Sequence, residues 1–298
     1  MLATLVREGF SNPDWIYEPK LDGIRCLAFR GVHRLSLLSR NRNPLNGEFP
    51  EVAASLLKQE LSHFVIDGEV VAFENGVTRF SLLQKRKQIH VPVFYYIFDV
   101  LYMDGYDLTD LELRHRKELL ERAFSYRDPL RKTEHLEAEG ETFFREACGK
   151  GWEGIIAKRA SSSYVPRRSL DWLKIKCENQ QEFVIVGYTE PAGQRVGIGA
   201  LLVGFYEDRK LLFAGKVGTG FDTQTLKDLE KKLSSIERPA AECAVVSVRK
   251  KGVHWVEPKF VAQIAFTEWT GSGKLRHPRF LGLRIDKKPS EVVREIPK

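Results

Sequence analysis

The hydrophobic pattern along the chain changes character near residue 178. Before this point, apolar residues recur at helical spacing in some stretches and form strand-like runs in others. The helical spacing predicts helices over 49–61, 113–124 and 140–151, the last ending at Gly149 or Gly151. Strands are predicted over 63–73 (two strands with a turn at Asp67-Gly68), over the apolar run 91–103, typical of a buried central strand, and over 154–159 and 171–176. The first part therefore mixes helices and strands.

After residue 178, most stretches alternate apolar and polar residues with the two-residue period of strands. We expect strands over 181–190, 200–218 and 242–250, and one helix over 223–236. About five strands with one helix suit a small barrel, for which an OB-fold is the leading choice. The polar stretch 177–181 is the expected hinge, so the predicted domains are 1–178 and 179–298.

Composition adds the size of the core and the class of partner. The chain has 298 residues, 43% hydrophobic and 11% aromatic, enough for two domains that each bury a core. Its net charge of +7 favours a polyanionic partner, nucleic acid above all, but charge alone does not prove one. No run approaches the ~18 apolar residues of a membrane span. The first residues also lack the pattern of a signal peptide.

The spacing of the cysteines indicates the redox state of the compartment. The four cysteines are scattered, with no C-x-x-C pair: Cys26, Cys148, Cys177 and Cys243. This spacing argues against a zinc knuckle or a disulfide framework and favours a reducing, cytoplasmic setting.

The stretch WIYEPKLDGIRC, residues 15–26, holds a lysine where a strand would bury apolar side chains. Lys20 stands two residues before an Asp-Gly turn signal. One interpretation is a β-hairpin whose charged tip faces water. The other is a lysine held on a rigid scaffold as a nucleophile. These twelve residues alone leave both open.

Further islands follow Lys20 in a fixed order. They are Ser39-Arg40-Asn41, Asp67-Gly68-Glu69, Phe98-Asp99, 153–156 (EGII), 172–176 (WLKIK) and 275–288 (LRHPRFLGLRIDKK). With the K-x-D-G-x-R motif at Lys20, this order resembles the covalent nucleotidyltransferases: ATP-dependent DNA ligases, RNA ligases and mRNA capping enzymes. Within that group, EGIIAKR, QEFVIVGYTEPAG and FAGKVGTGF look most like the ligase module of bacterial non-homologous end-joining DNA ligases.

The resemblance implies a fold and a reaction. The fold is α+β: an N-terminal adenylation (nucleotidyltransferase) domain of ATP-grasp-like antiparallel sheets with helices, and a C-terminal OB-fold β-barrel. The implied cofactors are ATP, whose AMP becomes covalently attached to Lys20, and Mg²⁺ or Mn²⁺. AMP would pass to the 5′-phosphate of a nick, and the 3′-hydroxyl would displace it.

The resemblance also assigns roles to single residues around the nucleotide. Lys20 is the catalytic nucleophile, Glu18 lies near the adenine edge and Phe98 over its ring. Arg40 and Glu69 hold the ribose, while Arg25 lies on the phosphate side. Without the resemblance, Phe98 in its apolar run would be read as a core residue. A lysine is almost wholly protonated at pH 7, so burial, Arg25, two further lysines and the metal are expected to lower the pKa of Lys20.

Those further lysines, Lys174 and Lys176, lie two apart on a predicted strand and so point to one face. There they would neutralise charge on the phosphates, although a pair of solvated lysines is the simpler alternative. Arg168, or Arg167 beside it, would be an additional triphosphate contact. Glu153 is the best metal ligand, with Glu69 and Asp22 as further candidates, although Glu153-Gly154 is also consistent with a plain turn.

The basic segment near the C-terminus resembles the one that orients pyrophosphate during the first step and then turns away. Arg276 and Arg279 carry this role, with Arg284 and Lys287 nearby. A solvated basic tail would be the ordinary interpretation of such residues.

The expected partner is nicked double-stranded DNA, with a Ku-like end-binding protein, no membrane and a monomeric state. The expected location is cytoplasmic, bacterial-type and nucleoid-associated. The chain has no room for polymerase or phosphoesterase modules, so it is a minimal ligase or a fragment, and nicks should be preferred over free ends. The rival hypotheses are an RNA ligase or mRNA guanylyltransferase, and a non-catalytic OB-fold nucleic-acid binder.

Overall fold

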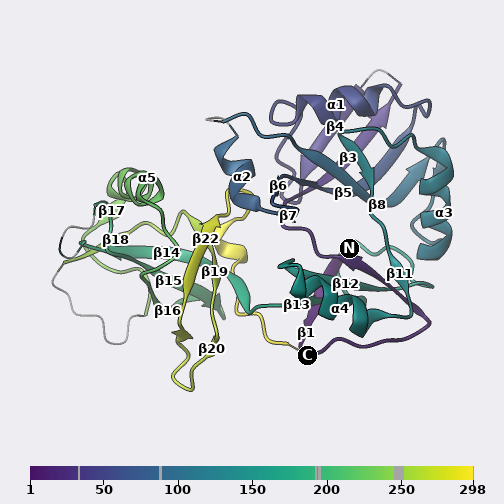
Figure 1. Cartoon of the computed structure of the whole chain (residues 1–298). Helices are drawn as coiled ribbons and strands as arrows, with labels where there is room; N and C mark the ends of the chain where they lie inside the picture. Colours follow the sequence, from purple (N-terminus) through teal and green to yellow (C-terminus); the bar gives the residue numbers. More distant parts are fainter. Residues whose placement is uncertain (33, 87–88, 192, 194–195, 245–251, 298) are drawn as a thin grey trace. The chain divides into compact units, whose positions relative to one another are not determined.

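The computed structural model describes residues 1–32, 34–86, 89–191, 193, 196–244 and 252–297 (Figure 1). The chain divides into two compact units. The first is Met1–Cys177 together with Ile296–Lys298, and the second is Glu178–Glu295. Each combines sheets that are mainly antiparallel with separate helices, which confirms the α+β class.

Two sheets dominate the described part of the first unit, named here by their strands β2 and β5. The β2 sheet has the order β1 (Leu2–Val6), β13 (Arg168–Lys176), β12 (Gly154–Arg159), β2 (Trp15–Pro19), β11 (Leu136–Glu137). The β5 sheet has the order β10 (Leu130–Lys132), β8 (Phe94–Met103), β5 (Phe64–Val71), β3 (Ile24–Gly31), β4 (Arg34–Ser39), with β9 (Tyr106–Asp107) beside β8. A small hairpin is formed by β6 (Phe73–Glu74) and β7 (Val77–Thr78). The β1–β13 and β8–β10 pairs are parallel.

The Lys20 stretch is not a hairpin, because its two strands belong to different sheets. Strand β2 pairs with β12 and β11, whereas β3 pairs with β4 and β5. Residues 20–23 therefore carry the chain from one sheet to the other. The backbone N–H of Lys20 still donates to Gly154 O at 2.9 Å, which fixes the lysine at the end of β2.

Helices pack on both sheets, and the three predicted helices of the first unit are confirmed. They are α1 (Pro50–Leu57), α3 (Leu113–Ala123) and α4 (Gly140–Gly149); a short α2 (Phe80–Lys85) was not predicted. Val52 and Leu56 of α1 enter the core of the β5 sheet, as does Leu120 of α3. Phe143 and Ala147 of α4 pack on the β2 sheet.

The predicted turn at Asp67-Gly68 is wrong, since β5 runs straight through these residues. Asp67 pairs with Leu27 of β3 in this strand, and its buried carboxylate is bound by Arg25. Gly68 is required by close packing rather than by a turn: a Cβ there would lie 2.5 Å from Cε2 of Tyr95. The predicted strand over 91–103 is confirmed as β8.

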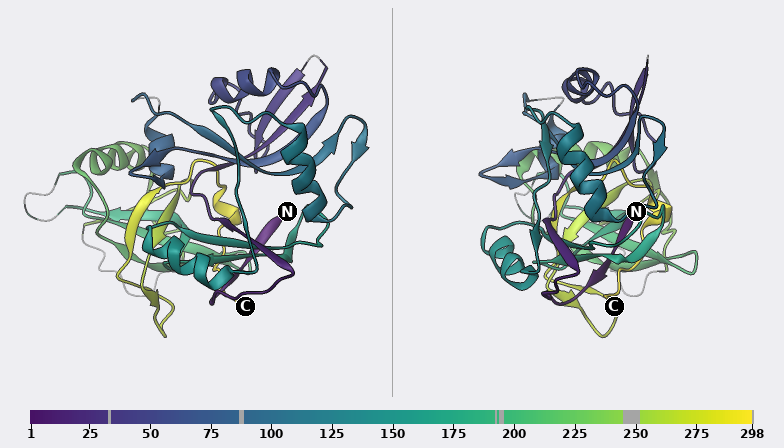
Figure 2. Two further views of the ribbon diagram at one scale, coloured as in Figure 1. Left: turned by 45° about the vertical axis from the view of Figure 1, so that its right-hand side comes forward. Right: turned by 90° about the vertical axis from the view of Figure 1, so that its right-hand side faces the viewer.

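In its described residues, the second unit consists of a seven-stranded sheet, a two-stranded sheet and one α-helix (Figures 1 and 2). Its strands are β14 (Gln180–Thr189), β15 (Ala200–Glu207), β16 (Lys210–Val217), β17 (Glu237–Arg238), β18 (Val253–Val256), β19 (Val261–Ala265), β20 (Glu268–Trp269), β21 (Leu275–Arg276) and β22 (Arg279–Leu283). A short 3₁₀ turn follows at Pro289–Glu291. Most of the predicted strand 242–250 lies outside the described residues.

The helix of this unit, α5 (Thr223–Ser234), matches the predicted helix. The Asp222 side chain caps it by accepting a hydrogen bond from Thr225 N at 2.7 Å. Leu226, Leu229 and Leu233 then lie on one face and join the core of the strands. Across the described residues of the whole chain, no helix has the length and apolar character needed to span a membrane.

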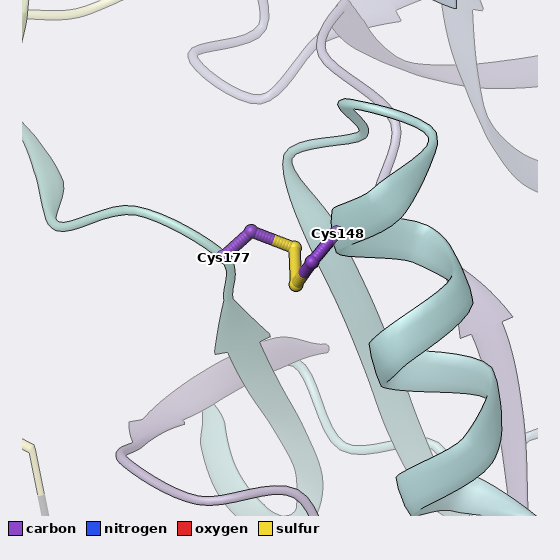
Figure 3. The surroundings of a disulfide bond; sticks show 2 residues. All are labelled: Cys148 and Cys177. Carbon is purple, nitrogen blue, oxygen red and sulfur yellow. A yellow bond between two sulfur atoms is a disulfide. The ribbon is translucent and has the colours of Figure 1, made fainter.

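One sequence-based expectation about the cysteines is wrong. Cys148, in the last turn of α4, forms a disulfide with Cys177, directly after β13 (Figure 3). The two are 29 residues apart in sequence, so their spacing gave no sign of the pairing, which arises because α4 packs on the β2 sheet. Cys26 and Cys243 are buried thiols, and burial raises the pKa of both.

Candidate active site

The strands of the β2 sheet separate apolar from charged side chains. Successive side chains of a strand point to opposite faces. One face buries Tyr17, Ile155 and Ile175 against α4. By alternation and register, the opposite face carries the predicted residues Glu18, Lys174 and Lys176 together with Lys158, and Lys20 lies just past the end of β2. The sheet therefore presents several of the predicted site residues on a single surface.

Lys20 is held by the predicted metal ligand. Its Nζ donates to Glu153 Oε2 at 2.6 Å, and both side chains are largely buried. Burial acts to lower the pKa of Lys20, but Glu153, with Asp22 and Glu69 further away, outweighs it and raises this pKa above its usual value. The expectation of a lowered pKa is wrong for this state, because the nearest charge is an anion and not a cation.

Glu18 has two lysine partners that the sequence did not reveal. Lys158 Nζ donates to Glu18 Oε2 at 2.6 Å, and Lys117 of α3 forms an ion pair with Oε1. Burial would raise the pKa of Glu18, but the two lysines prevail and lower it. Burial also lowers the pKa of Lys158 to about 8. Glu18 is therefore a buried carboxylate that stays ionised.

Two aromatic rings lie against this charged group. Lys158 Nζ is 4.3 Å from the centre of the Phe98 ring and 4.1 Å from that of Trp172. The two rings meet edge to face at 5.9 Å. Phe98 thus lies in a small buried cluster with Met1 and Trp172, apart from the main core of the β5 sheet, and its role over an adenine ring stays a prediction.

The β5 sheet contributes Arg25 and Glu69, which lie opposite each other on β3 and β5. The Arg25 guanidinium forks onto the buried Asp67 carboxylate, with one N–H···O distance of 2.9 Å. Tyr164 donates to the same carboxylate at 2.9 Å. Burial would raise the pKa of Asp67, but Arg25 outweighs it and holds this pKa low. Arg25 is therefore oriented by its neighbours before any ligand is considered.

Asp22 has a structural contact besides its predicted metal role. Its carboxylate accepts a hydrogen bond from Phe80 N at 3.1 Å, at the start of α2. Its own N–H donates to Thr78 Oγ1 at 3.0 Å. These bonds tie the segment after Lys20 to the β7–α2 corner.

The remaining candidates lie on the surface of their units. Arg40 follows β4 and is exposed. Arg168, the first residue of β13, donates to Ala3 O. In the second unit, Arg276 pairs with Glu268 at 2.6 Å and Arg279 with Glu178 at 3.2 Å. The roles assigned to these arginines stay predictions.

Sequence reasoning missed Lys117, Lys158, Asp67 and Tyr164 as parts of the site. Two of them carried a signal. Ile156 of β12 pairs with Glu18 of β2. Lys158 lies two residues further along β12, so it shares the face of Glu18. Lys117 lies on the face of α3 that helical spacing turns toward the core, where it interrupts the apolar stripe. A cation in such a stripe requires a buried anion.

Comparison with known proteins agrees with this geometry. The family model described as "ATP dependent DNA ligase domain" matches residues 1–176, and the model described as "ATP dependent DNA ligase C terminal region" matches 194–287. The multifunctional non-homologous end joining protein LigD of Pseudomonas aeruginosa is 39% identical over 99% of this chain, which spans 36% of that protein. A DNA ligase of Thermococcus fumicolans is 30% identical over 93% of the chain, which spans 53% of it.

A solved structure extends the likeness to three dimensions. The mycobacterial DNA ligase D complexed with ATP and MES superimposes with a TM-score of 0.70 at 36% identity, covering 99% of this chain and 98% of that one. The first unit is accordingly a ligase nucleotidyltransferase domain and the second an OB-fold domain, as expected. Together, the matched models, the relatives and the Lys20 site show that the chain belongs to the ATP-dependent DNA ligases.

Proposed function

We propose that this chain seals nicks between a 3′-hydroxyl and a 5′-phosphate in duplex DNA through a lysyl-AMP intermediate on Lys20. The observation that carries the proposal is the placement of Lys20. Its Nζ lies 2.6 Å from Glu153 at the crossing between two sheets, and the Glu18–Phe98 group lies on the same unit. A nucleophile on rigid strands meets the positional demand of phosphoryl transfer.

In the first step, Lys20 Nζ would attack the α-phosphorus of ATP. An N–P bond forms, the bond to the bridging oxygen breaks and pyrophosphate leaves. The attacking amine must first lose a proton, and in the present state Glu153 favours the protonated form. Release of Lys20 from Glu153 would leave burial as the main influence, which lowers the pKa of Lys20, so that its ammonium can release a proton to solvent and free the lone pair. The ion pair thus favours the ammonium form of Lys20, and its release is proposed to accompany adenylation.

The second and third steps use the same surface. The 5′-phosphate oxygen of the nick attacks the lysyl-AMP phosphorus, and Lys20 leaves. The 3′-hydroxyl then loses its proton to solvent as its oxygen attacks the 5′-phosphorus, and AMP leaves with the electron pair of the broken P–O bond. Lys174 and Lys176 share one face of β13 and are proposed to neutralise the charge that builds on the phosphate oxygens.

A divalent metal, Mg²⁺ or Mn²⁺, is proposed to be held chiefly by Glu153. In the described residues, no group of three or more acidic, histidine or cysteine side chains could hold a metal alone. A hard cation could take the Glu153 carboxylate and complete its shell with phosphate oxygens and water. When bound, the metal would neutralise phosphate charge. Glu69 and Asp22 are weaker candidates, and Asp22 already bonds to α2.

The wider setting is proposed from the relatives. A chain of net charge +7 would grip DNA mainly through phosphates, so binding should weaken as salt rises. We propose that the chain acts in end joining with a Ku-like partner in the bacterial cytoplasm. It would do so as a monomer that prefers nicks, with domains over residues 1–178 and 179–298. The names of the relatives support the pathway, not the partner or the monomer.

Single-turnover sealing of a nicked duplex tests the proposal. A 5′-labelled strand is incubated with the protein, ATP and Mg²⁺, and denaturing gels follow DNA-adenylate and sealed product. We expect both species with the nick and little product with a blunt duplex at equal concentration. The same assay with a nicked RNA duplex, and with GTP in place of ATP, separates an RNA ligase or a guanylyltransferase. Faster blunt joining, or sealing of RNA alone, would contradict the proposal.

A further inference from the structure

Helix α3 carries two adjacent cations on its buried side, and each reaches a different sheet. Arg116 is fully buried and forks onto the Asp99 carboxylate, with N–H···O distances of 2.7 and 3.0 Å. Asp99 directly follows Phe98 on β8 of the β5 sheet. Lys117 forms the ion pair with Glu18, on β2 of the other sheet. The helix therefore joins the strand that bears Phe98 to the strand that bears Glu18.

Burying four charged side chains costs desolvation free energy, so their presence here calls for an explanation other than stability. Ion pairs inside a protein gain little net free energy, because desolvating the two charges offsets their attraction. A pair of apolar residues would hold α3 on the sheets as well. What an ion pair adds is a fixed direction for the carboxylate, which is useful where that carboxylate must meet another group.

We propose that Lys117 is a specificity-determining positioning residue, which fixes the Glu18 carboxylate so that it accepts a hydrogen bond from the 6-amino group of adenine. The inference rests on the proposed function and on the roles that the family resemblance implies, with Glu18 near the adenine edge and Phe98 over its ring. Lys158 donates to Oε2 and Lys117 forms an ion pair with Oε1, so a cation beside each oxygen favours one orientation of the carboxylate. Each ionised oxygen retains a lone pair for a further donor.

The arrangement distinguishes purines by chemistry. A carboxylate that stays ionised only accepts hydrogen bonds, so it favours the amino group of adenine and opposes the carbonyl oxygen at the same position of guanine. A site built to bind a donor rejects an analogue that lacks it, because its own buried acceptor is left unpaired. Lys117 touches neither purine nor phosphate in this scheme and acts only through Glu18.

The test compares nucleotidylation of Lys20 with ATP, GTP and purine riboside triphosphate, which lacks the 6-amino group. We expect the parent to prefer ATP. In Lys117→Met, which keeps the chain length and loses the charge, the KM for ATP should rise and the preference should fall about 10- to 100-fold, as for a lost hydrogen bond to a charged group. Lys117→Arg should restore most of it. Lys150→Met removes an exposed lysine paired with Glu146 and serves as the matched control.

The ratio between nucleotides keeps the test decisive even if Lys117→Met is less stable, since the active fraction cancels in a ratio. A purely structural role would lower all three rates alike, and an unchanged preference in Lys117→Met would overturn the inference. If Glu18→Gln loses the preference while Lys117→Met keeps it, the role of Glu18 stands and that of Lys117 falls. If the parent forms no adduct with any nucleotide, the proposed function fails, and the inference with it.

Discussion

The two faces of the β2 sheet are made from the same strands and do opposite work. On β13, Ile175 is fully buried against α4, while its neighbours Lys174 and Lys176 point to the other side. On β2, Tyr17 is buried in the same apolar cluster, and Glu18 beside it is buried among charges. Apolar burial on one face thus stabilises the folded state, and the other face holds charges in fixed positions.

The difference shows how a strand can position chemistry without a loop. Each charged side chain is anchored by an apolar neighbour one residue away on the opposite face, and the strand transmits that rigidity. The buried charges persist because they are paired, as in Lys20–Glu153 and Glu18–Lys158. Substitutions on the charged face should therefore lower activity, while substitutions of adjacent residues on the apolar face should lower stability.

The largest expected effect comes from the charged face. Lys174→Met should slow adenylation of Lys20 by about 10²–10³-fold, as for loss of one charge-stabilising donor. Rapid-quench assays with labelled ATP would measure it, with the melting temperature recorded alongside. A loss of activity matched by an equal loss of folded protein would contradict the division between the faces.

The opposite result is expected one residue further along. Ile175→Ala should lower the free energy of unfolding by about 2–5 kcal/mol, because it leaves a cavity under α4. Adenylation per folded molecule, measured well below the melting temperature, should change less than in Lys174→Met. Denaturant titration gives the stability, and an undiminished free energy of unfolding would show that the apolar face is not what anchors the sheet.

The disulfide sharpens the comparison because it fastens α4 to the end of β13. Cys148→Ser should cost roughly 3.6 kcal/mol or less, from the loop-closure entropy of the 29-residue separation. Thermal unfolding with and without a thiol reductant measures this, and Cys243→Ser, a buried free thiol in the second unit, is the control. Equal sensitivity to reductant in parent and Cys148→Ser would show that the bond does not form in solution.

The smallest effect is a dependence on pH that belongs to the charged face. The pKa values of Glu18 and Asp67 are lowered in the folded state by their cationic partners. Their stabilisation is therefore present above the unfolded-state values, which lie near 4. It is lost as the pH falls through the lowered folded-state values.

The melting temperature of the parent should consequently fall more steeply below about pH 4 than that of Asp67→Asn, which lacks one of the two groups. Exposed Asp110 provides the control substitution, Asp110→Asn. Parallel acid profiles for the parent and Asp67→Asn would contradict the assignment.

Local sequence predicted α1, α3, α4, α5 and the strand β8, because hydrophobic spacing acts over a few residues. It did not predict contacts made across the fold. Lys117 lies 99 positions from Glu18 and Tyr164 lies 97 from Asp67, so no local pattern joins them. The same holds for Cys148 and Cys177. The raised pKa of Lys20 was missed because its direction depends on Glu153 being nearer than any cation.

The central claim is that Lys20 is the nucleophile, and intact mass spectrometry tests it most directly. The parent and Lys20→Ala are incubated with ATP and Mg²⁺ and weighed without denaturing acid, since a phosphoamide is acid-labile. We predict the added mass of one AMP on the parent and none on Lys20→Ala. No adduct on the parent with ATP or GTP, or an adduct that persists in Lys20→Ala, would contradict the account.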